Sequence, residues 1–163
     1  MTVVGDMQAG HWPAIAEIFR QGIATGQATF ETNVPDWDAW DAGHLPSCRL
    51  VAHQNGAVAG WAALSPASRR PVYRGVAEVS VYVAEAARGR GVGRALLDAL
   101  VIASEKAGLW TLQAVMFPEN DASVALHTGC GFRLVGRRER LAQLHGAWRD
   151  VVLLERRSAI LPA

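Results

Sequence analysis

The chain has 163 residues and a mass of 17.5 kDa, and half of its residues are apolar, which is typical of one compact domain spanning residues 1–163. Sixteen basic residues against fifteen acidic ones leave a net charge of +1, so we expect no nucleic acid partner. No apolar run approaches the ~20 residues that a bilayer span needs, and we see no basic segment followed by a hydrophobic stretch in the first residues. We therefore expect a soluble cytoplasmic protein with no membrane partner.

The first half of the chain predicts a helix followed by a hairpin. Pro13 suits the first turn of a helix over 12–24, where apolar residues three and four apart form one stripe. Asn55 and Gly56 separate two apolar segments, which is a strong signal for a hairpin turn. The expected elements are a strand at 2–4, the helix at 12–24, a loop at 27–46 that leads into a short second helix, and strands at 49–53 and 57–64.

The second half alternates strands and helices. Over 76–83, β-branched residues occupy one parity, as expected for a central strand. Over 92–107, apolar residues recur at offsets of three and four, and Gly108 follows as a stop. The remaining expected elements are a strand at 109–116, a short helix at 121–128, and a terminal pair of strands at 132–138 and 147–157.

Cysteines and histidines give no sign of a metal. Cys48 and Cys130 lie far apart with no cluster of ligands near either, and the five histidines are scattered without a ligand spacing. We expect neither a disulfide framework nor a metal. Lys106 is the single lysine among sixteen basic residues, so the chain uses arginine almost everywhere that it needs a positive charge. Any one arginine can therefore be an ordinary solvated surface residue rather than a functional one.

The most informative segment, 81–94, places a strand, a loop with three glycines and a long helix in succession. Glycines let the backbone approach a ligand closely, and the first amides of a helix have no internal partner and lie at the positive end of its dipole. A pyrophosphate group fits such a place. Arg88, Arg90 and Arg94 add charge-assisted donors there.

Two familiar phosphate-binding loops do not fit this segment. A Walker loop needs Lys and then Ser or Thr after its last glycine, whereas Arg94 and Ala95 follow Gly93. The dinucleotide fingerprint needs a further glycine that is absent here. The pattern Arg-x-x-Gly-x-Gly, met by Arg88, Gly91 and Gly93, resembles the acetyl-CoA loop of the GNAT acetyltransferases. The alternative is a glycine-rich turn that only starts a helix.

A second segment supports this resemblance. Residues 120–132 resemble the second GNAT signature, in which an Asn opens a helix and Gly-Phe enters the next strand. Further matches resemble the branch of phosphinothricin and methionine sulfoximine N-acetyltransferases, and together they cover about 1–157. They are Thr29-Phe30-Glu31, Gly60-Trp61-Ala62, 73–83 and Gly146-Ala147-Trp148-Arg149-Asp150.

The resemblance implies a fold, a cosubstrate and a reaction. The fold is a single mixed α/β domain with a twisted, mostly antiparallel sheet and helices on both faces. Acetyl-CoA is the cosubstrate, its pantetheine arm pairs with the backbone of Val81 and Val83, and the amine attacks the thioester directly. The implied cofactor-binding residues are Val81, Tyr82, Val83, Arg88, Gly89, Arg90, Gly91, Val92, Gly93, Arg94, Asn120 and Ser123.

Two residues are candidates for proton transfer. Glu78 stands at the acidic position of the family and is the candidate general base, acting directly or through water; the alternative is a structural pair with Arg74 or another Arg. His127 stands where many GNAT enzymes carry a Tyr that protonates the leaving sulfur, and the alternative is a packing role beside the cofactor. Tyr82 is a weaker candidate for the acid.

For the acceptor, the resemblance suggests the α-amine of a small amino acid such as methionine sulfoximine, methionine sulfone or phosphinothricin. Tyr73 and Arg74 are candidates for its carboxylate, and Phe30 and Glu31 for the border of its pocket. The alternatives are another amine (a polyamine, an aminoglycoside or a protein N-terminus) and a non-catalytic acyl-CoA-binding module. The family also suggests a homodimer.

Overall fold

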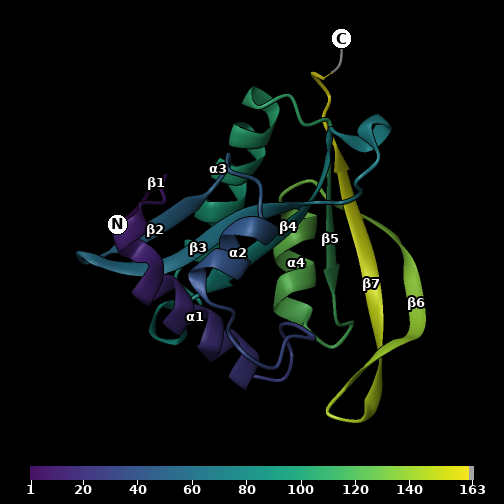
Figure 1. Cartoon of the computed structure of the whole chain (residues 1–163), viewed down its shortest axis with the longest axis horizontal. Coiled ribbons are helices and arrows are strands. Elements are labelled where there is room, and N and C mark those ends of the chain that lie inside the picture. Colours follow the sequence, from purple (N-terminus) through teal and green to yellow (C-terminus); the bar gives the residue numbers. More distant parts are fainter. Residues whose placement is uncertain (162–163) are drawn as a thin grey trace.

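The computed structural model describes residues 1–161 as a seven-stranded sheet in the order β1-β2-β3-β4-β5-β7-β6 (Figure 1). Neighbouring strands are antiparallel, except that β4 and β5 run parallel. The strands are β1 (Thr2–Asp6), β2 (Leu50–Gln54), β3 (Ala57–Pro66), β4 (Val76–Val83), β5 (Thr111–Met116), β6 (Arg133–Leu144) and β7 (Ala147–Arg157). The helices are α1 (Trp12–Ala24), α2 (Trp37–Gly43), α3 (Val92–Lys106) and α4 (Asp121–Gly129).

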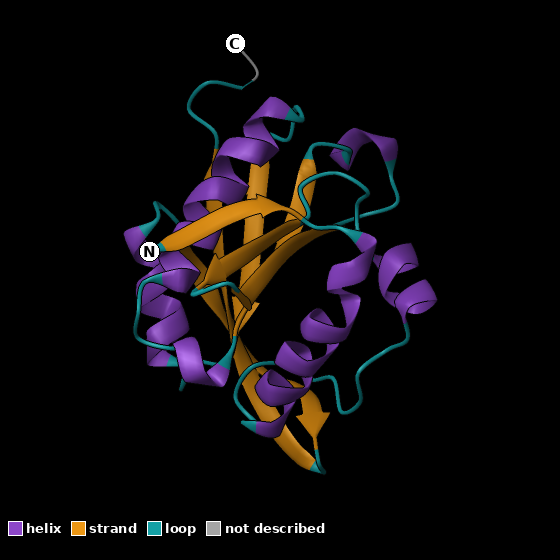
Figure 2. Ribbon diagram, turned by 90° about the vertical axis from the view of Figure 1, so that its left-hand side faces the viewer, coloured by secondary structure: helices purple, strands orange, loops and turns teal. Residues whose placement is uncertain are grey.

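Helices cover both faces of this sheet, which confirms the expected fold class (Figure 2). Alternation along β2 and β3 sends successive side chains to opposite faces. Val51, Trp61 and Ala63 form one cluster with apolar residues of α1 and α2. Their neighbours along the strands pack on the other side, against α3 residues such as Leu96 and Leu100. Burial of each such leucine contributes about 1.5–3 kcal/mol.

The parallel strands β4 and β5 separate along their length. They are paired only over Val76–Glu78 and Thr111–Gln113, although β4 continues to Val83 and β5 to Met116. Figure 1 shows the two strands spreading apart beyond this point. From residue 79 onward, β4 is therefore paired with β3 on one side only, and its backbone groups on the other side face a gap.

The main departure from the predicted elements is the length of β6. The sequence predicts a strand that ends at Arg138, but β6 runs to Leu144 with a register shift between Arg138 and Ala142. Asp150 holds the irregular part, because its carboxylate accepts hydrogen bonds from the Arg140 amide at 2.7 Å and from the Arg137 guanidinium. An exposed edge strand needs no alternation of apolar and polar residues, so the sequence after Arg138 gives no sign that the strand continues. The short second helix, α2 at Trp37–Gly43, lies inside the stretch 27–46 rather than after it, and the other predicted ends lie within two residues of the observed ones.

Candidate active site

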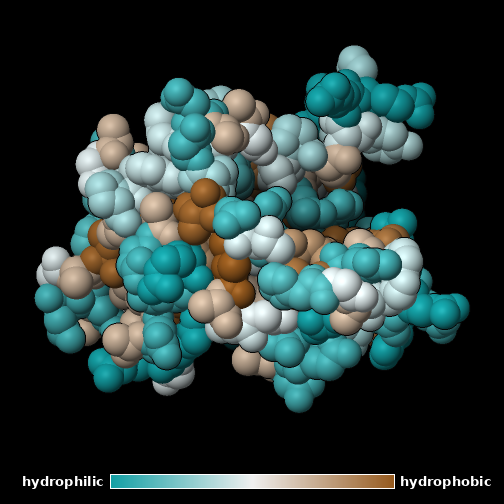
Figure 3. Space-filling view, turned by 60° about the horizontal axis from the view of Figure 1, so that its bottom comes forward, coloured by the Kyte–Doolittle hydropathy of each residue, from teal (hydrophilic) through white to brown (hydrophobic). Residues whose placement is uncertain are grey.

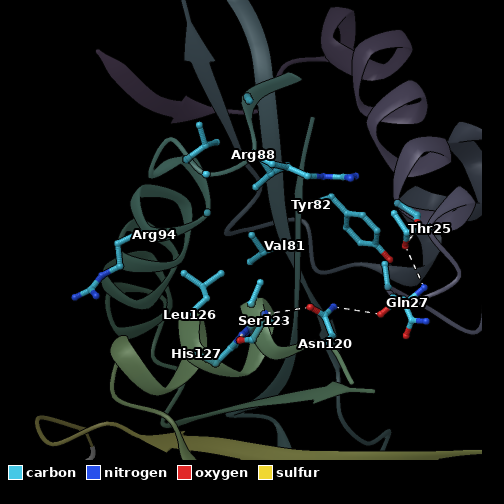
Figure 4. Close-up of a pocket in the computed structure, with 18 of the residues that line it drawn as sticks. Thr25, Gln27, Val81, Tyr82, Arg88, Arg94, Asn120, Ser123, Leu126 and His127 are labelled. Atoms are coloured by element: carbon cyan, nitrogen blue, oxygen red, sulfur yellow. Dashed lines mark hydrogen bonds between the residues drawn. The ribbon is translucent and has the colours of Figure 1, made fainter. Parts of the chain in front are cut away.

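A groove of about 510 Å³ lies between the end of α1, strand β4, the glycine loop and α4. On the face that carries it, the space-filling view shows a furrow floored by apolar side chains (Figure 3). Figure 4 shows side chains from these four segments around the groove. Most of the predicted cofactor residues line it: Val81, Tyr82, Val83, Arg88, Gly89, Gly91, Val92, Gly93, Arg94, Asn120 and Ser123.

The glycine loop has the backbone that the sequence predicts for a phosphate site. Gly89 and Gly91 have φ angles of 75° and 82°, a region that favours glycine. Gly91 is the N-cap residue of the 15-residue helix α3. A Cβ atom built at either glycine would meet nothing within 4 Å. Residues 91–94 also line the groove, so the start of α3, where the amides have no partner within the helix, borders the space in which an anion could lie.

The three arginines of this loop are placed differently. Arg88 extends across the groove in Figure 4. Arg94 has its side chain pointing away from the groove, where its Nε lies 3.0 Å from Asp98 Oδ2. Arg90 is exposed on the loop and does not line the groove. Of the predicted charge-assisted donors, Arg88 is thus the one whose side chain reaches over the groove.

Asn120 connects α4 to the segment after α1. Its Oδ1 accepts a hydrogen bond from the Ser123 amide at 3.1 Å, which caps α4. Its Nδ2 donates to the Gln27 carbonyl oxygen at 3.2 Å. The predicted cofactor residue Asn120 therefore also fixes the width of the groove at this end, where Thr25 and Gln27 form the opposite wall. The sequence gives no local signal for these two residues.

His127 is buried on α4, and its ring is neutral near pH 7. Nδ1 lies 2.8 Å from the Ser123 carbonyl oxygen, so Nδ1 carries the proton and donates. Burial lowers the pKa of His127 below its ordinary value. The remaining nitrogen, Nε2, is then an acceptor. The ring must therefore take up a proton before it can protonate a leaving group.

A second cavity with two lobes opens beside the groove. The β5 lobe, of about 260 Å³, extends along Ala114–Met116 and includes Phe30 and His127. The α2 lobe, of about 380 Å³, extends toward Trp40 and His44. The lobes share five polar residues, which are Thr29, Glu31, Glu78, Ser80 and Tyr82. The β5 lobe also shares His127, Val81 and Ser123 with the groove, so the cavity and the groove adjoin.

Glu78 lies at the point where β4 and β5 separate, because the pair Glu78–Gln113 is the last one between these strands. Its side chain is half-buried. Gln113 Nε2 donates to Glu78 Oε1 at 3.2 Å. Among the described residues Glu78 has no ion pair, and Arg74 instead lies 5.3 Å above the Trp110 ring. The structural Glu78–Arg74 pair is therefore not observed.

The predicted acceptor residues separate into two groups. Glu31 lines both lobes with Glu78, and Phe30 lines the β5 lobe, where its ring meets Phe117 edge to face at 4.9 Å. Tyr73 and Arg74 are exposed at the end of the short 3-10 helix Pro71–Tyr73 and line neither the groove nor either lobe. Trp37 and Trp40 pack α2 onto the core.

Tyr82 lines the groove and both lobes, so its side chain lies between them. Its ring stacks on Trp61 at 4.8 Å, and the ring of Phe19 lies against it at 4.9 Å with a tilt of 30°. Burial raises the pKa of Tyr82 to about 12, so the phenol keeps its proton at neutral pH. Gly22 of α1 makes room for the ring, since a Cβ atom there would lie 2.7 Å from Tyr82 Cδ2 and Cε2. Sequence patterns gave no sign of this contact.

The variant Gly22→Ala is expected to lose about 1–3 kcal/mol of unfolding free energy, because the stacked Tyr82 ring cannot move aside without breaking its own packing. The matched control is Gly43→Ala in α2, where the added Cβ meets nothing within 4 Å and helix propensity favours alanine by up to about 1 kcal/mol. Urea denaturation measures both. Equal stability of the two variants would contradict the close contact.

The stability of the protein is expected to fall as the pH drops below about 6.5. Burial lowers the pKa of His44 and His127 below 6.5, whereas the unfolded chain protonates both near that value. Below pH 6.5 the unfolded state therefore binds more protons than the folded state. The free energy of unfolding is at its full value above the ordinary pKa, and it decreases as the pH falls from the ordinary pKa to the lowered one. Urea denaturation at about pH 7.5 and pH 5.5 measures this loss, which His127→Gln should reduce. An unchanged loss in that variant would refute the assignment.

An open β4 edge, a glycine loop at the start of a long helix, and a carboxylate where the strands part have the arrangement expected of an acetyl-CoA-dependent N-acetyltransferase. Residues 12–132 match the model of the acetyltransferase (GNAT) family, and the chain belongs to this family.

Known relatives narrow the similarity further. The chain is 38% identical over 154 residues to phosphinothricin N-acetyltransferase of Alcaligenes faecalis, with 88% of this chain and 76% of the relative covered. It is 30% identical over 147 residues to the L-methionine sulfoximine/L-methionine sulfone acetyltransferase of Salmonella typhimurium, with 87% and 86% covered. A crystal structure of a GNAT superfamily phosphinothricin acetyltransferase from Sinorhizobium meliloti in complex with acetyl-CoA is similar with a TM-score of 0.86 at 32% identity, covering 96% of this chain and 88% of that one.

Two further findings concern the described part of the chain. Residues 1–161 contain no group of three or more His, Cys, Asp or Glu side chains that could hold a metal ion. None of the helices in this range combines the length and the apolar character that crossing a membrane requires.

Proposed function

We propose that the protein transfers the acetyl group of acetyl-CoA to the α-amine of a small amino acid of the methionine sulfoximine, methionine sulfone or phosphinothricin type. The observation that carries this proposal is the junction of the groove and the two-lobed cavity beside Glu78 and His127. Two relatives named for such acceptors, at 38% and 30% identity, support the substrate class.

The groove suits the cosubstrate. The amides that follow Gly91 and the Arg88 guanidinium would hold the pyrophosphate. The open edge of β4 offers backbone groups of Val81 and Val83 to a pantetheine arm. When bound, acetyl-CoA supplies an acetyl group activated as a thioester. The gap beside β4 would give this group a path toward Glu78.

Two side chains divide the proton transfers. Acetylation of an ammonium group releases two protons from nitrogen, one to solvent and one to the coenzyme sulfur. Glu78 would take the first proton, which makes the amine nucleophilic. His127, with a free Nε2, would take the second as the new C–N bond forms and pass it to the departing sulfur. Tyr82 stays protonated and can donate a hydrogen bond nearby.

The charge of the cavity supports an ammonium substrate. Glu31 and Glu78 line both lobes, and no Lys or Arg lines either of them. Two carboxylates attract a cation and disfavour an acceptor without one. Because the same charge also suits a polyamine, a polyamine is the second candidate acceptor. That Tyr73 and Arg74 bind the carboxylate of an amino acid stays a prediction, since both residues are exposed and line neither lobe.

Release of free coenzyme thiol tests the proposal. With acetyl-CoA, we expect turnover of L-methionine sulfoximine, L-methionine sulfone or phosphinothricin, and acetylation at the α-nitrogen by mass spectrometry. Faster turnover of spermidine would favour the polyamine. Binding of acetyl-CoA with no turnover of any amine would indicate a binding module and overturn the proposal.

The variant His127→Phe separates proton transfer from packing. We expect kcat to fall about 10²-fold or more, because the chemical step loses its proton carrier, while the Kd for acetyl-CoA changes little. Phe keeps the edge-to-face contact that His127 makes with Phe132 at 5.2 Å. Single-turnover kinetics and calorimetric binding measure the two effects. A loss of binding with an unchanged chemical step would assign His127 a packing role.

We further propose a cytoplasmic homodimer that pairs through the β6–β7 hairpin. Four large apolar side chains of this hairpin are more than a third exposed: Leu134, Val135, Leu141 and Trp148. Sedimentation equilibrium of the wild type should give twice the chain mass, and Leu134→Glu should lower it. A monomeric wild type would refute the dimer.

A further inference from the structure

The α2 lobe of the cavity has no part in the proton transfers proposed above. It begins at the polar residues around Glu78 and ends at α2, where Trp40, Gly43 and His44 line it together with Trp61 and Ser65 of β3. An acceptor whose amine lies at Glu78 would extend its side chain either into this lobe or into the β5 lobe. The α2 lobe has a volume of about 380 Å³ and the β5 lobe about 260 Å³, so each has room for a small side chain. The residues at the end of the α2 lobe therefore influence which acceptor side chains the enzyme can bind.

His44 presents a hydrogen-bond acceptor at this end. Its Nδ1 lies 2.6 Å from the Trp40 carbonyl oxygen, so Nδ1 carries the proton and Nε2 carries a lone pair. The ring is held by stacking on Trp40 at 4.1 Å with an interplanar angle of 20°. Nε2 has no hydrogen-bond partner among the described residues, yet it is not one of the nitrogens sealed from solvent. It is thus open to a ligand.

The nitrogen donors beside His44 are not free for an anion, and the hydroxyl of Ser65, which also lines this end, can either donate or accept. The indole nitrogens of Trp40 and Trp61 are sealed from solvent, so a ligand in the lobe does not reach them. The guanidinium of Arg49 is used by Asp41 and by the carbonyl oxygens of Leu45 and His44. Burial lowers the pKa of His44, which keeps the ring neutral at pH 7. An oxyanion at this end would lie against a lone pair without a partner.

We infer that His44 determines acceptor specificity, by accepting a hydrogen bond at Nε2 from a donor at the end of the acceptor side chain. The inference rests on the proposed function and deepens it. The class of acceptor that it favours is an α-amino acid whose side chain ends in an N–H group, such as a sulfoximine or a carboxamide. A group of the same shape that carries only oxygen acceptors loses the bond and places two lone pairs against each other.

Methionine sulfoximine and methionine sulfone form a matched pair for the test, because they differ only by N–H in place of one oxygen. With saturating acetyl-CoA, we expect wild-type kcat/KM to favour the sulfoximine by about tenfold, mainly through KM. In His44→Phe, which keeps a ring against Trp40 but has no nitrogen, the ratio should fall to about one. In His44→Gln, whose side-chain oxygen can accept in place of Nε2, the preference should remain. His44→Leu serves if the Phe variant does not fold.

The outcomes separate the two proposals. Turnover of both acceptors with no preference in the wild type, or a preference that survives His44→Phe or His44→Leu, overturns the role of His44 and leaves the proposed function intact. No turnover of either acceptor, together with binding of acetyl-CoA, overturns the proposed function and this inference with it. Thermal unfolding and acetyl-CoA titration of each variant ensure that only folded, cofactor-binding protein enters the comparison.

Discussion

The variant Glu78→Gln is expected to lower kcat by about 10²- to 10⁴-fold at neutral pH, because the amide cannot take a proton from the acceptor ammonium. The substitution preserves the side-chain volume. In the wild type, Gln113 Nε2 donates a hydrogen bond to Glu78 Oε1 at 3.2 Å, and the amide oxygen of the variant can still accept this bond. The Kd for acetyl-CoA should stay close to the wild-type value, since Glu78 lines the two lobes and not the groove. Steady-state kinetics and calorimetry measure both quantities.

A pH profile distinguishes the loss of a base from a general disturbance of the site. As the pH rises toward the pKa of the acceptor's amine, more of the substrate arrives already deprotonated, so the deficit of Glu78→Gln should shrink. Glu17→Gln, on an exposed turn of α1 where Glu17 pairs with Arg20, is the matched control and should keep wild-type rates. A Glu78→Gln enzyme as active as the wild type across the pH range would mean that the base lies elsewhere.

The elements and the glycine loop could be predicted because their signals are local. A strand, three glycines and a helix stripe follow one another within 81–107, and each pattern reflects neighbours along the chain. Gly89 and Gly91 accordingly have the positive φ angles that the loop requires. The part of β6 after Arg138 escaped prediction for the same reason, because an exposed edge held by Asp150 leaves no local apolar pattern.

Contacts between distant segments could not be predicted from local patterns. Gly22 looks like a weak point near the end of a helix, and its close approach to Tyr82 becomes visible only once α1 lies on β4. His44 joins Glu78 in one cavity although 34 positions separate them (78 − 44), and no motif includes it. Conversely, Tyr73 and Arg74 lie only a few positions before Glu78, but the exposed turn keeps both outside the cavity. Convergence in space, rather than proximity in sequence, selects the site.

The variant Gly91→Asp is expected to lose the rise in melting temperature that acetyl-CoA gives the wild type. The new carboxylate would stand at the start of α3, where the proposed pyrophosphate binds. Two unit charges about 4 Å apart near a protein surface repel by about 4 kcal/mol, which corresponds to a roughly 100- to 1000-fold weaker Kd. At a ligand concentration near 100 times the wild-type Kd, a stabilisation of about 2.7 kcal/mol would largely vanish.

The matched control is Gly91→Asn, because Asn has the shape of Asp without its charge and both residues tolerate a positive φ, here 82°. Both variants should lose about 1 kcal/mol of unfolding free energy without ligand, since neither has the freedom of glycine. Asp is moreover a favoured N-cap residue, so a fall in binding cannot be ascribed to a melted helix. Asn should keep most of the thermal shift with acetyl-CoA and Asp should not. If both variants kept it, the pyrophosphate would have to bind away from the start of α3; if both lost it, backbone strain and not charge would be the cause.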